Sequence, residues 1–198
     1  HLAFFSANTC YWQIRLAPSM QPGKADRIVI AYKSTAHAQD PVLLDLDSSN
    51  DQLATTKWRS PPVHQPEASL LGGMYLEGAI PFDGNLVIQS PTHWIMRNTG
   101  LHEGDQLPGL LGYEVDGDAQ SAPANRVVIA RSPVGQRMAT ATIYEASSGA
   151  IVFNAGTMQW AWGLDDYNRE APGSSRVHPA VQQMTRNLLA RFLDAPTH

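Results

Sequence analysis

The sequence predicts an α/β fold on three observations: an apolar run leading into a tight turn, several β-rich runs, and an amphipathic helix near the end. At the start, the apolar and small residues 2–7 precede Asn8, a pattern typical of a buried strand that turns sharply into a helix. Because this strand is apolar on both faces, we expect it to be central in the sheet. Asn8 would then lie at the carboxyl end of a strand, where α/β sheets hold ligands.

Further strands are predicted by runs of β-branched residues bounded by turn residues. We expect them over residues 27–33, 85–89, 126–131, 139–145 and 150–154. The last two are separated by Ala-Ser-Ser-Gly, which favours a hairpin. Pro91 predicts a short helical turn that extends to Met96.

The clearest helix begins at Pro179, a residue suited to the first helical position. An apolar stripe follows at helical spacing and predicts that this helix packs on the sheet. The stripe consists of Val181, Met184, Leu188 and Phe192, and Leu189 and Leu193 are expected to widen it.

Residues 34–83 have no clear periodicity and are rich in Pro, Ser, Asp and Gln. Long excursions of this kind are functional loops or covering segments, and we interpret this one as an irregular insertion. We expect residues 1–198 to form a single domain, the downstream part of something larger, because no segment precedes the first strand to pair with it or cover it.

Composition excludes several classes of protein. The formal net charge of −4, without a basic patch, argues against nucleic-acid binding. No apolar run is long enough to cross a membrane, so we expect no membrane association. A single cysteine, Cys10, rules out an intrachain disulfide and is compatible with a cytoplasmic protein.

The nucleophile and metal motifs of common enzymes are missing: the sequence has no GxSxG, GxGxxG or HExxH. Cys10 follows the first strand and is either a nucleophile or a small filler. His93 follows a strand and either lines a cleft or makes a structural hydrogen bond. The pair Trp160 and Trp162 is either a sugar-stacking platform or, more commonly, part of the core.

Asn8 and Glu114 are the strongest polar candidates. The side chain of asparagine both donates and accepts hydrogen bonds, as recognition of an amide requires. Glu114 stands between Tyr113 and Val115, and a carboxylate in apolar surroundings is suited to proton transfer.

Four segments, in this order and followed by the final helix, carry a family resemblance: LAFFSANTCYW, SPTHWIMRNTGL, LPGLLGYEVDG and IVFNAGTMQWAWGLD. They resemble the carboxy-terminal domain of the large (beta) subunit of N,N-dimethylformamidase and its relatives, over nearly the whole chain. The resemblance implies a class I glutamine-amidotransferase-like, flavodoxin-like sandwich, of which this chain is the carboxy-terminal portion. Asn8 then occupies the place of the amidotransferase cysteine nucleophile, with Cys10 shortly after it.

The resemblance also implies an activity, the hydrolysis of a small amide with iron as Lewis acid. By motif, Asn8 matches the active-site asparagine of the family and would orient the substrate or the oxyanion. Glu114 matches a glutamate near the metal and would act as base or proton shuttle. Phe153 matches an aromatic of the pocket wall, and we expect Trp12 and His93 to line the same substrate pocket.

The iron ligands of the family, two tyrosines and a glutamate, lie upstream of the strand at which this chain starts. We therefore expect no metal ligands or cofactor in this chain, which would be inactive without the upstream portion of the same protein or a companion chain. Oligomerisation stays open. Two alternatives remain: a metal-free binding or scaffolding module on the same fold, and a thiol-dependent amidotransferase-like enzyme using Cys10.

Overall fold

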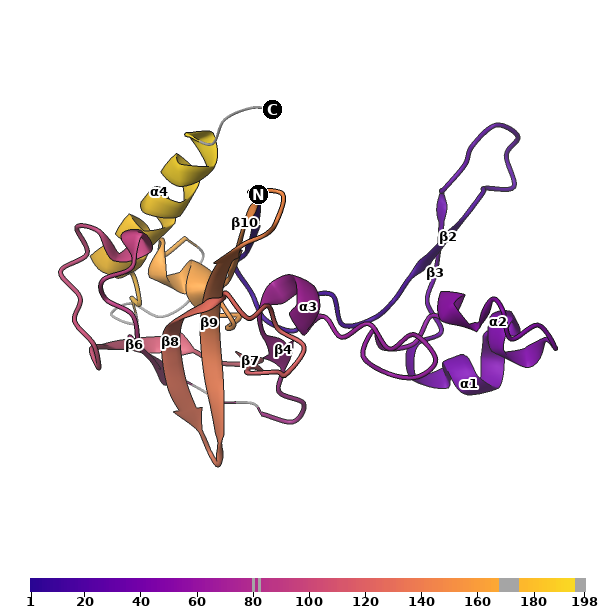
Figure 1. Ribbon diagram of the computed structural model, residues 1–198, viewed down its shortest axis with the longest axis horizontal. Helices are drawn as coiled ribbons and strands as arrows, with labels where there is room; N and C mark the ends of the chain where they lie inside the picture. Colours follow the sequence, from indigo (N-terminus) through magenta and orange to yellow (C-terminus); the bar gives the residue numbers. More distant parts are fainter. Residues whose placement is uncertain (80, 82, 168–174, 195–198) are drawn as a thin grey trace. The chain divides into compact units, whose positions relative to one another are not determined.

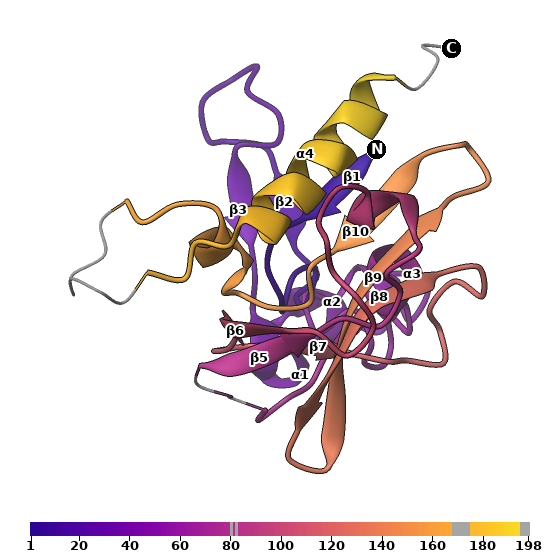
Figure 2. The ribbon, with the colours of Figure 1, turned by 90° about the vertical axis from the view of Figure 1, so that its left-hand side faces the viewer.

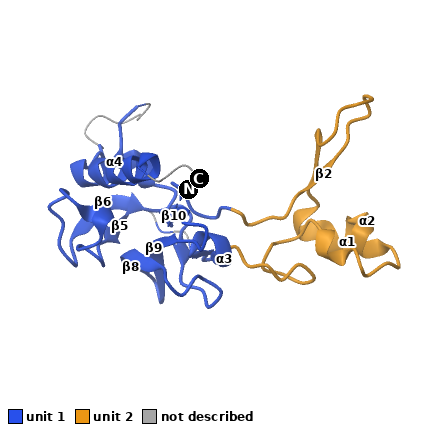
Figure 3. Cartoon of the chain, turned by 45° about the horizontal axis from the view of Figure 1, so that its top comes forward, with its two compact units in different colours: residues 1–9, 68–198 blue, residues 10–67 orange. Residues whose placement is uncertain are grey.

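The computed structural model of the chain describes residues 1–79, 81, 83–167 and 175–194. It has a mixed α/β fold, as predicted, and divides into two compact units (Figure 3). Unit 1 contains residues 1–9 and 68–198, and unit 2 contains residues 10–67. The predicted insertion over residues 34–83 therefore overlaps unit 2 but has different boundaries.

Unit 1 is built on a curled sheet of six strands (Figure 1). The sheet order is β1-β10-β9-β7-β4, and β8 pairs with β9 outside this path. Among the described strands of this sheet, β1 and β10 run parallel and the other pairs are antiparallel. The strands are β1 (Leu2–Phe4), β4 (Met74–Tyr75), β7 (Asp116–Gly117), β8 (Val127–Val134), β9 (Arg137–Glu145) and β10 (Ile151–Asn154).

Two predictions about the start of the chain are wrong. Within the described residues β1 pairs with β10 alone, so it is an edge strand rather than a central one, and Leu2 is exposed. After Asn8 the chain does not enter a helix but continues through a turn into unit 2. This mostly antiparallel sheet lacks the parallel strand order expected of a flavodoxin-like sandwich.

The remaining elements of unit 1 surround the sheet. A two-stranded antiparallel ladder joins β5 (Gly84–Val87) to β6 (Gln106–Leu111). The helical segments are α3 (Ala68–Leu71), η3 (Trp94–Met96), η4 (Trp160–Gly163) and α4 (Pro179–Leu193). The apolar core of unit 1 includes residues of β6, β8, β9, β10 and α4, with Phe153 and Trp160 fully buried in it.

The final helix agrees well with its prediction. It begins at Pro179, and Val181, Met184 and Leu188 are buried. Figure 2 shows α4 beside β1 and β10, and the ring of Phe192 stacks on that of His1. However, Leu189 and Leu193 are exposed and do not widen the buried stripe.

Unit 2 contains the hairpin of β2 (Arg15–Ala17) and β3 (Ile28–Ile30) and short helical segments. The helical segments are η1 (Lys33–Thr35), α1 (Ala36–Gln39), α2 (Pro41–Leu44) and η2 (Asp51–Leu53). A fully buried carboxylate, Asp40, joins these elements, because it pairs with Arg15 at 2.8 Å and accepts two hydrogen bonds from Thr55. None of the helices in the described ranges has the length and apolarity needed to cross a bilayer.

Candidate functional site at the end of strand β1

The site begins with the tight turn that follows β1. Ala7 is buried, and the next residue, Asn8, has a left-handed backbone conformation with φ of 54°. Most side chains avoid this conformation, but asparagine tolerates it. The turn predicted at Asn8 is therefore present.

Asn8 makes two hydrogen bonds to residues more than a hundred positions away. Its backbone N–H donates to Oδ1 of Asp116 at 2.9 Å, and its side-chain Nδ2 donates to Oε1 of Glu114 at 2.9 Å. Glu114 and Asp116 are two positions apart, and both contact Asn8 from the segment that leads into β7 (Asp116–Gly117). The two candidates singled out from the sequence, Asn8 and Glu114, are thus in direct contact.

Two buried residues, Asp116 and Asn154, support the contact between Asn8 and Glu114. Both are fully buried, and Nδ2 of Asn154, the last residue of β10, donates to Oδ2 of Asp116 at 2.9 Å. Asn154 in turn accepts from the backbone N–H of Gly156. Gly156 has φ of 63°, and a Cβ there would overlap the carbonyl oxygen of Thr140, so only glycine fits.

One polar atom of the site is left over. Oδ1 of Asn8 is buried, and no donor among the described residues reaches it. A buried acceptor without a donor costs roughly 1–3 kcal/mol, and such atoms are often explained by function or by a bound molecule. Chemically, the site combines an oriented amide with a half-buried carboxylate, a pair suited to binding an amide group and moving a proton.

Comparison with known protein families places this geometry in context. Residues 1–173 match the family described as N,N-dimethylformamidase beta subunit-like, C-terminal. The chain belongs to this family. The match includes every residue of the site just described, from Asn8 to Asn154, and confirms the resemblance inferred from the sequence. Among curated proteins no match was found.

The three other residues predicted for the substrate pocket have different surroundings. Phe153 is fully buried, and its ring packs against Phe5 and Trp160 in the core, so its role in a pocket wall stays a prediction. His93 lines a separate cavity near Ile151, at the start of β10, whereas Asn8 lies beyond the end of β1. Trp12 belongs to unit 2, where it packs edge-on against Tyr11.

Two further expectations concern the turn at Asn8: a nucleophilic role for Cys10 and the place of the iron. Cys10 is exposed and begins unit 2, while Asn8 directly follows the buried Ala7 in the turn after β1. Over the described residues, no three His, Cys, Asp or Glu side chains are grouped as a metal site requires. Where the complete protein holds the iron of the family stays a prediction.

Sequence reasoning missed Asp116 and Asn154, although each carried a signal. Asp116 follows Glu114 at the spacing that shares one face of a strand, and Asn154 ends the β-rich run IVFN. Trp160 is buried in the core, which confirms the more common role of a paired tryptophan. The ring of Trp162 instead packs against Tyr113 and carries the guanidinium of Arg176 at 4.4 Å from its centroid.

Proposed function

We propose that this chain contributes a substrate-orienting amide, Asn8, and a proton-transferring carboxylate, Glu114, to a dimethylformamidase-like amidohydrolase of small amides. The observation that carries the proposal is the 2.9 Å hydrogen bond between Nδ2 of Asn8 and Glu114. It joins an asparagine in the left-handed turn after β1 to a half-buried carboxylate, and the family is named after a subunit of an amidase.

In this proposal each group has one task. The amide of Asn8 carries two N–H donors, and the one not used by Glu114 donates to the carbonyl oxygen of the substrate. Water attacks the carbonyl carbon and gives a proton to Glu114, while negative charge develops on that oxygen beside Asn8. The C–N bond then breaks, the proton passes from Glu114 to the leaving amine, and a carboxylic acid and an amine are released.

Asp116 and Asn154 act as positioning residues in this scheme. Asp116 holds the backbone of Asn8, and Asn154 holds Asp116, with both bonds at 2.9 Å. Because both are fully buried, they restrict the turn to one geometry. Preorganised donors cost little reorganisation when charge develops during the reaction.

The proposal also includes a partner and a place for the metal. Over the described residues β1 pairs on one side only, and we propose that an upstream portion or companion chain pairs with its other edge. That portion would also hold the family's iron, which would supply a Lewis acid for the hydrolysis. A cytoplasmic location, compatible with a single cysteine, remains part of the proposal.

The test is amine release from N,N-dimethylformamide by the complete protein, with iron content measured for every preparation. Asn8→Ala should lower kcat by about 10² to 10³, as expected for loss of one donor to an oxyanion. Glu114→Gln keeps the shape of the side chain and should lower kcat more than it changes KM. Asn98→Ala, at an exposed asparagine with φ of 62°, and Glu103→Gln are the matched controls.

Two results would overturn the proposal. One is full activity of folded, iron-replete Asn8→Ala or Glu114→Gln. The other is a complete, iron-replete protein that hydrolyses neither this amide nor formamide nor acetamide, which would favour a binding or scaffolding role.

A further inference from the structure

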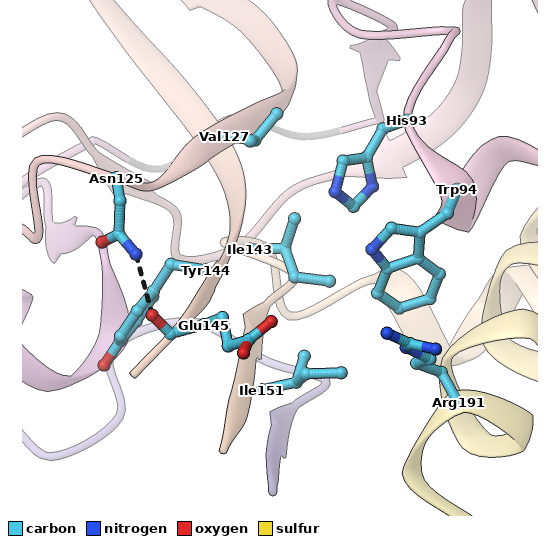
Figure 4. A pocket seen from close by; sticks show the side chains of 9 residues that line it. All are labelled: His93, Trp94, Asn125, Val127, Ile143, Tyr144, Glu145, Ile151 and Arg191. Carbon is cyan, nitrogen blue, oxygen red and sulfur yellow. Dashed lines mark hydrogen bonds between the residues drawn. The ribbon is translucent and has the colours of Figure 1, made fainter. Parts of the chain in front are cut away.

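A cavity in unit 1 lies away from the Asn8 site and is not needed for the proposed hydrolysis. It has a volume of about 200 Å³ and lies near the start of β10, around His93, Trp94, Glu145 and Arg191 (Figure 4). Sites for drug-sized ligands occupy roughly 300–1,000 Å³, so this cavity suits only a small molecule.

His93 supplies a hydrogen-bond donor to this cavity. Its Nδ1 accepts from the backbone N–H of Ile95 at the start of η3. Burial lowers the pKa of the imidazole below its ordinary value, so the ring is neutral at physiological pH and carries its proton on Nε2. Figure 4 shows the ring directed toward the space above Ile143.

Two opposite charges face the same space from different elements. Glu145 comes from β9 and Arg191 from α4, and their charged ends point toward one another across the cavity (Figure 4). Neither forms an ion pair with any residue that the structure describes. The backbone of Glu145 is fixed, because its carbonyl oxygen accepts from Asn125 at 2.8 Å.

The space between the charges is apolar. Ile143 and Ile151 are 2% and 6% exposed, and both line the cavity together with the indole of Trp94. An apolar wall between an anionic and a cationic group gives three kinds of contact in one small volume. A ligand with a single charge would use only one of the two charged groups.

We propose that this cavity binds a small zwitterion of the class of apolar α-amino acids. The ammonium group of the ligand pairs with Glu145, its carboxylate pairs with Arg191 and accepts from Nε2 of His93, and its side chain packs on Ile143 and Ile151. Arginine suits this role because its planar guanidinium donates two parallel hydrogen bonds to a carboxylate.

The test is calorimetric titration of the complete protein with three probes of similar shape: L-leucine, isocaproate, which lacks the ammonium group, and isoamylamine, which lacks the carboxylate. Leucine should bind at least about tenfold more tightly than either analogue, because each analogue lacks one of the two charge-assisted contacts. Binding of all three with equal affinity, or no saturable binding of leucine at about 10 mM, contradicts the proposal.

Two variants assign the contacts. Arg191→Gln should weaken the binding of leucine by about tenfold but leave that of isoamylamine within about twofold of wild type. Glu145→Gln should also weaken the binding of leucine by about tenfold but leave that of isocaproate within about twofold of wild type. Arg186→Gln, at an exposed arginine of the same helix outside the cavity, is the control. If Glu145 and Arg191 pair with each other in solution instead, neither variant weakens leucine and the proposal fails. Amide hydrolysis is measured separately, so the two proposals fail independently.

Discussion

Replacement of Asn8 by aspartate separates a functional site from a simple turn. Aspartate tolerates the left-handed turn nearly as well as asparagine and caps equally well. If Asn8 only shaped the backbone, the substitution would therefore leave the free energy of unfolding almost unchanged. In the structure, however, the new carboxylate would replace the donor that Glu114 accepts from at 2.9 Å, beside Asp116. The change turns an attractive contact into a repulsive one.

The magnitude follows from these contacts. Loss of a hydrogen bond to a charged acceptor costs about 2 kcal/mol. Two carboxylates about 4 Å apart repel by up to about 4 kcal/mol at an effective dielectric constant near 20, and rotation of the half-buried Glu114 toward solvent relieves most of this. We expect Asn8→Asp to destabilise the protein by about 3 kcal/mol near pH 7, and by about 1 kcal/mol near pH 4, where one proton can be shared between the carboxylates.

The assay is urea unfolding of the wild type and the variant at both pH values. Asn98→Asp is the matched control, since Asn98 is exposed and has φ of 62°. If Asn8→Asp stays within about 0.5 kcal/mol of wild type near pH 7, like its control, Asn8 only shapes the turn and the argument for the site is refuted.

Three further predictions concern the support of the site, unit 2 and the cavity at His93. Gly156→Ala should lower the free energy of unfolding by about 2–4 kcal/mol, measured by thermal unfolding, because its Cβ would overlap a backbone carbonyl. Gly149→Ala, in open space at φ of 80°, should lower it by only about 1 kcal/mol, and equal losses would contradict the role given to Gly156. In unit 2, burial alone would raise the pKa of Asp40, but Arg15 and Thr55 outweigh it and hold that pKa well below its usual range, so its stabilisation is present at neutral pH and is lost as the pH falls below about 3.8. Asp40→Asn should destabilise unit 2 by about 3 kcal/mol, measured as faster hydrogen exchange of the Thr55 amide, and an unchanged exchange rate would contradict this. Because the pKa of His93 is lowered by burial, its neutral form stabilises the fold above about pH 6.5, and this contribution falls as the pH decreases. His93→Asn keeps an acceptor for the N–H of Ile95 and should reduce the change of the unfolding free energy between about pH 7 and 5. If that pH dependence is unaltered in the variant, His93 is not responsible for it.

Local patterns predicted most individual elements of unit 1. The run of β-branched residues near residue 140 became β9, the Ala-Ser-Ser-Gly turn joins β9 to β10, and Pro179 begins α4. These features depend on neighbours within a few residues, which a sequence displays directly. Burial of the apolar stripe of α4 followed for the same reason, apart from Leu189 and Leu193.

Sheet order could not be predicted in this way. The start of β1 pairs with β10 about 150 residues later, and no local pattern indicates which strand lies beside which. Apolar residues on both faces predict a central strand, yet β1 is at the edge within the described residues. The turn at Asn8 was correctly predicted, but its continuation was not, because the chain leaves for unit 2 rather than forming a helix over the sheet.

The sequence predicted two of the four residues of the candidate site. Asn8 and Glu114 came from strand-end position and family motif, and the structure brings them into contact. Asp116 and Asn154 were missed because their importance comes from burial and from a hydrogen bond between two distant segments. His93 was assigned to this site by its place after a strand, which says nothing about the end of the sheet to which that strand leads.

The central claim is that Asn8 and Glu114 act as one catalytic unit, and a double-mutant cycle on kcat for amide hydrolysis tests it most directly. Groups that serve the same transition state are strongly non-additive, so the double variant Asn8→Ala with Glu114→Gln should be within about threefold of the slower single variant. If the two losses instead multiply, each residue acts independently and the hydrogen bond between them has no catalytic meaning.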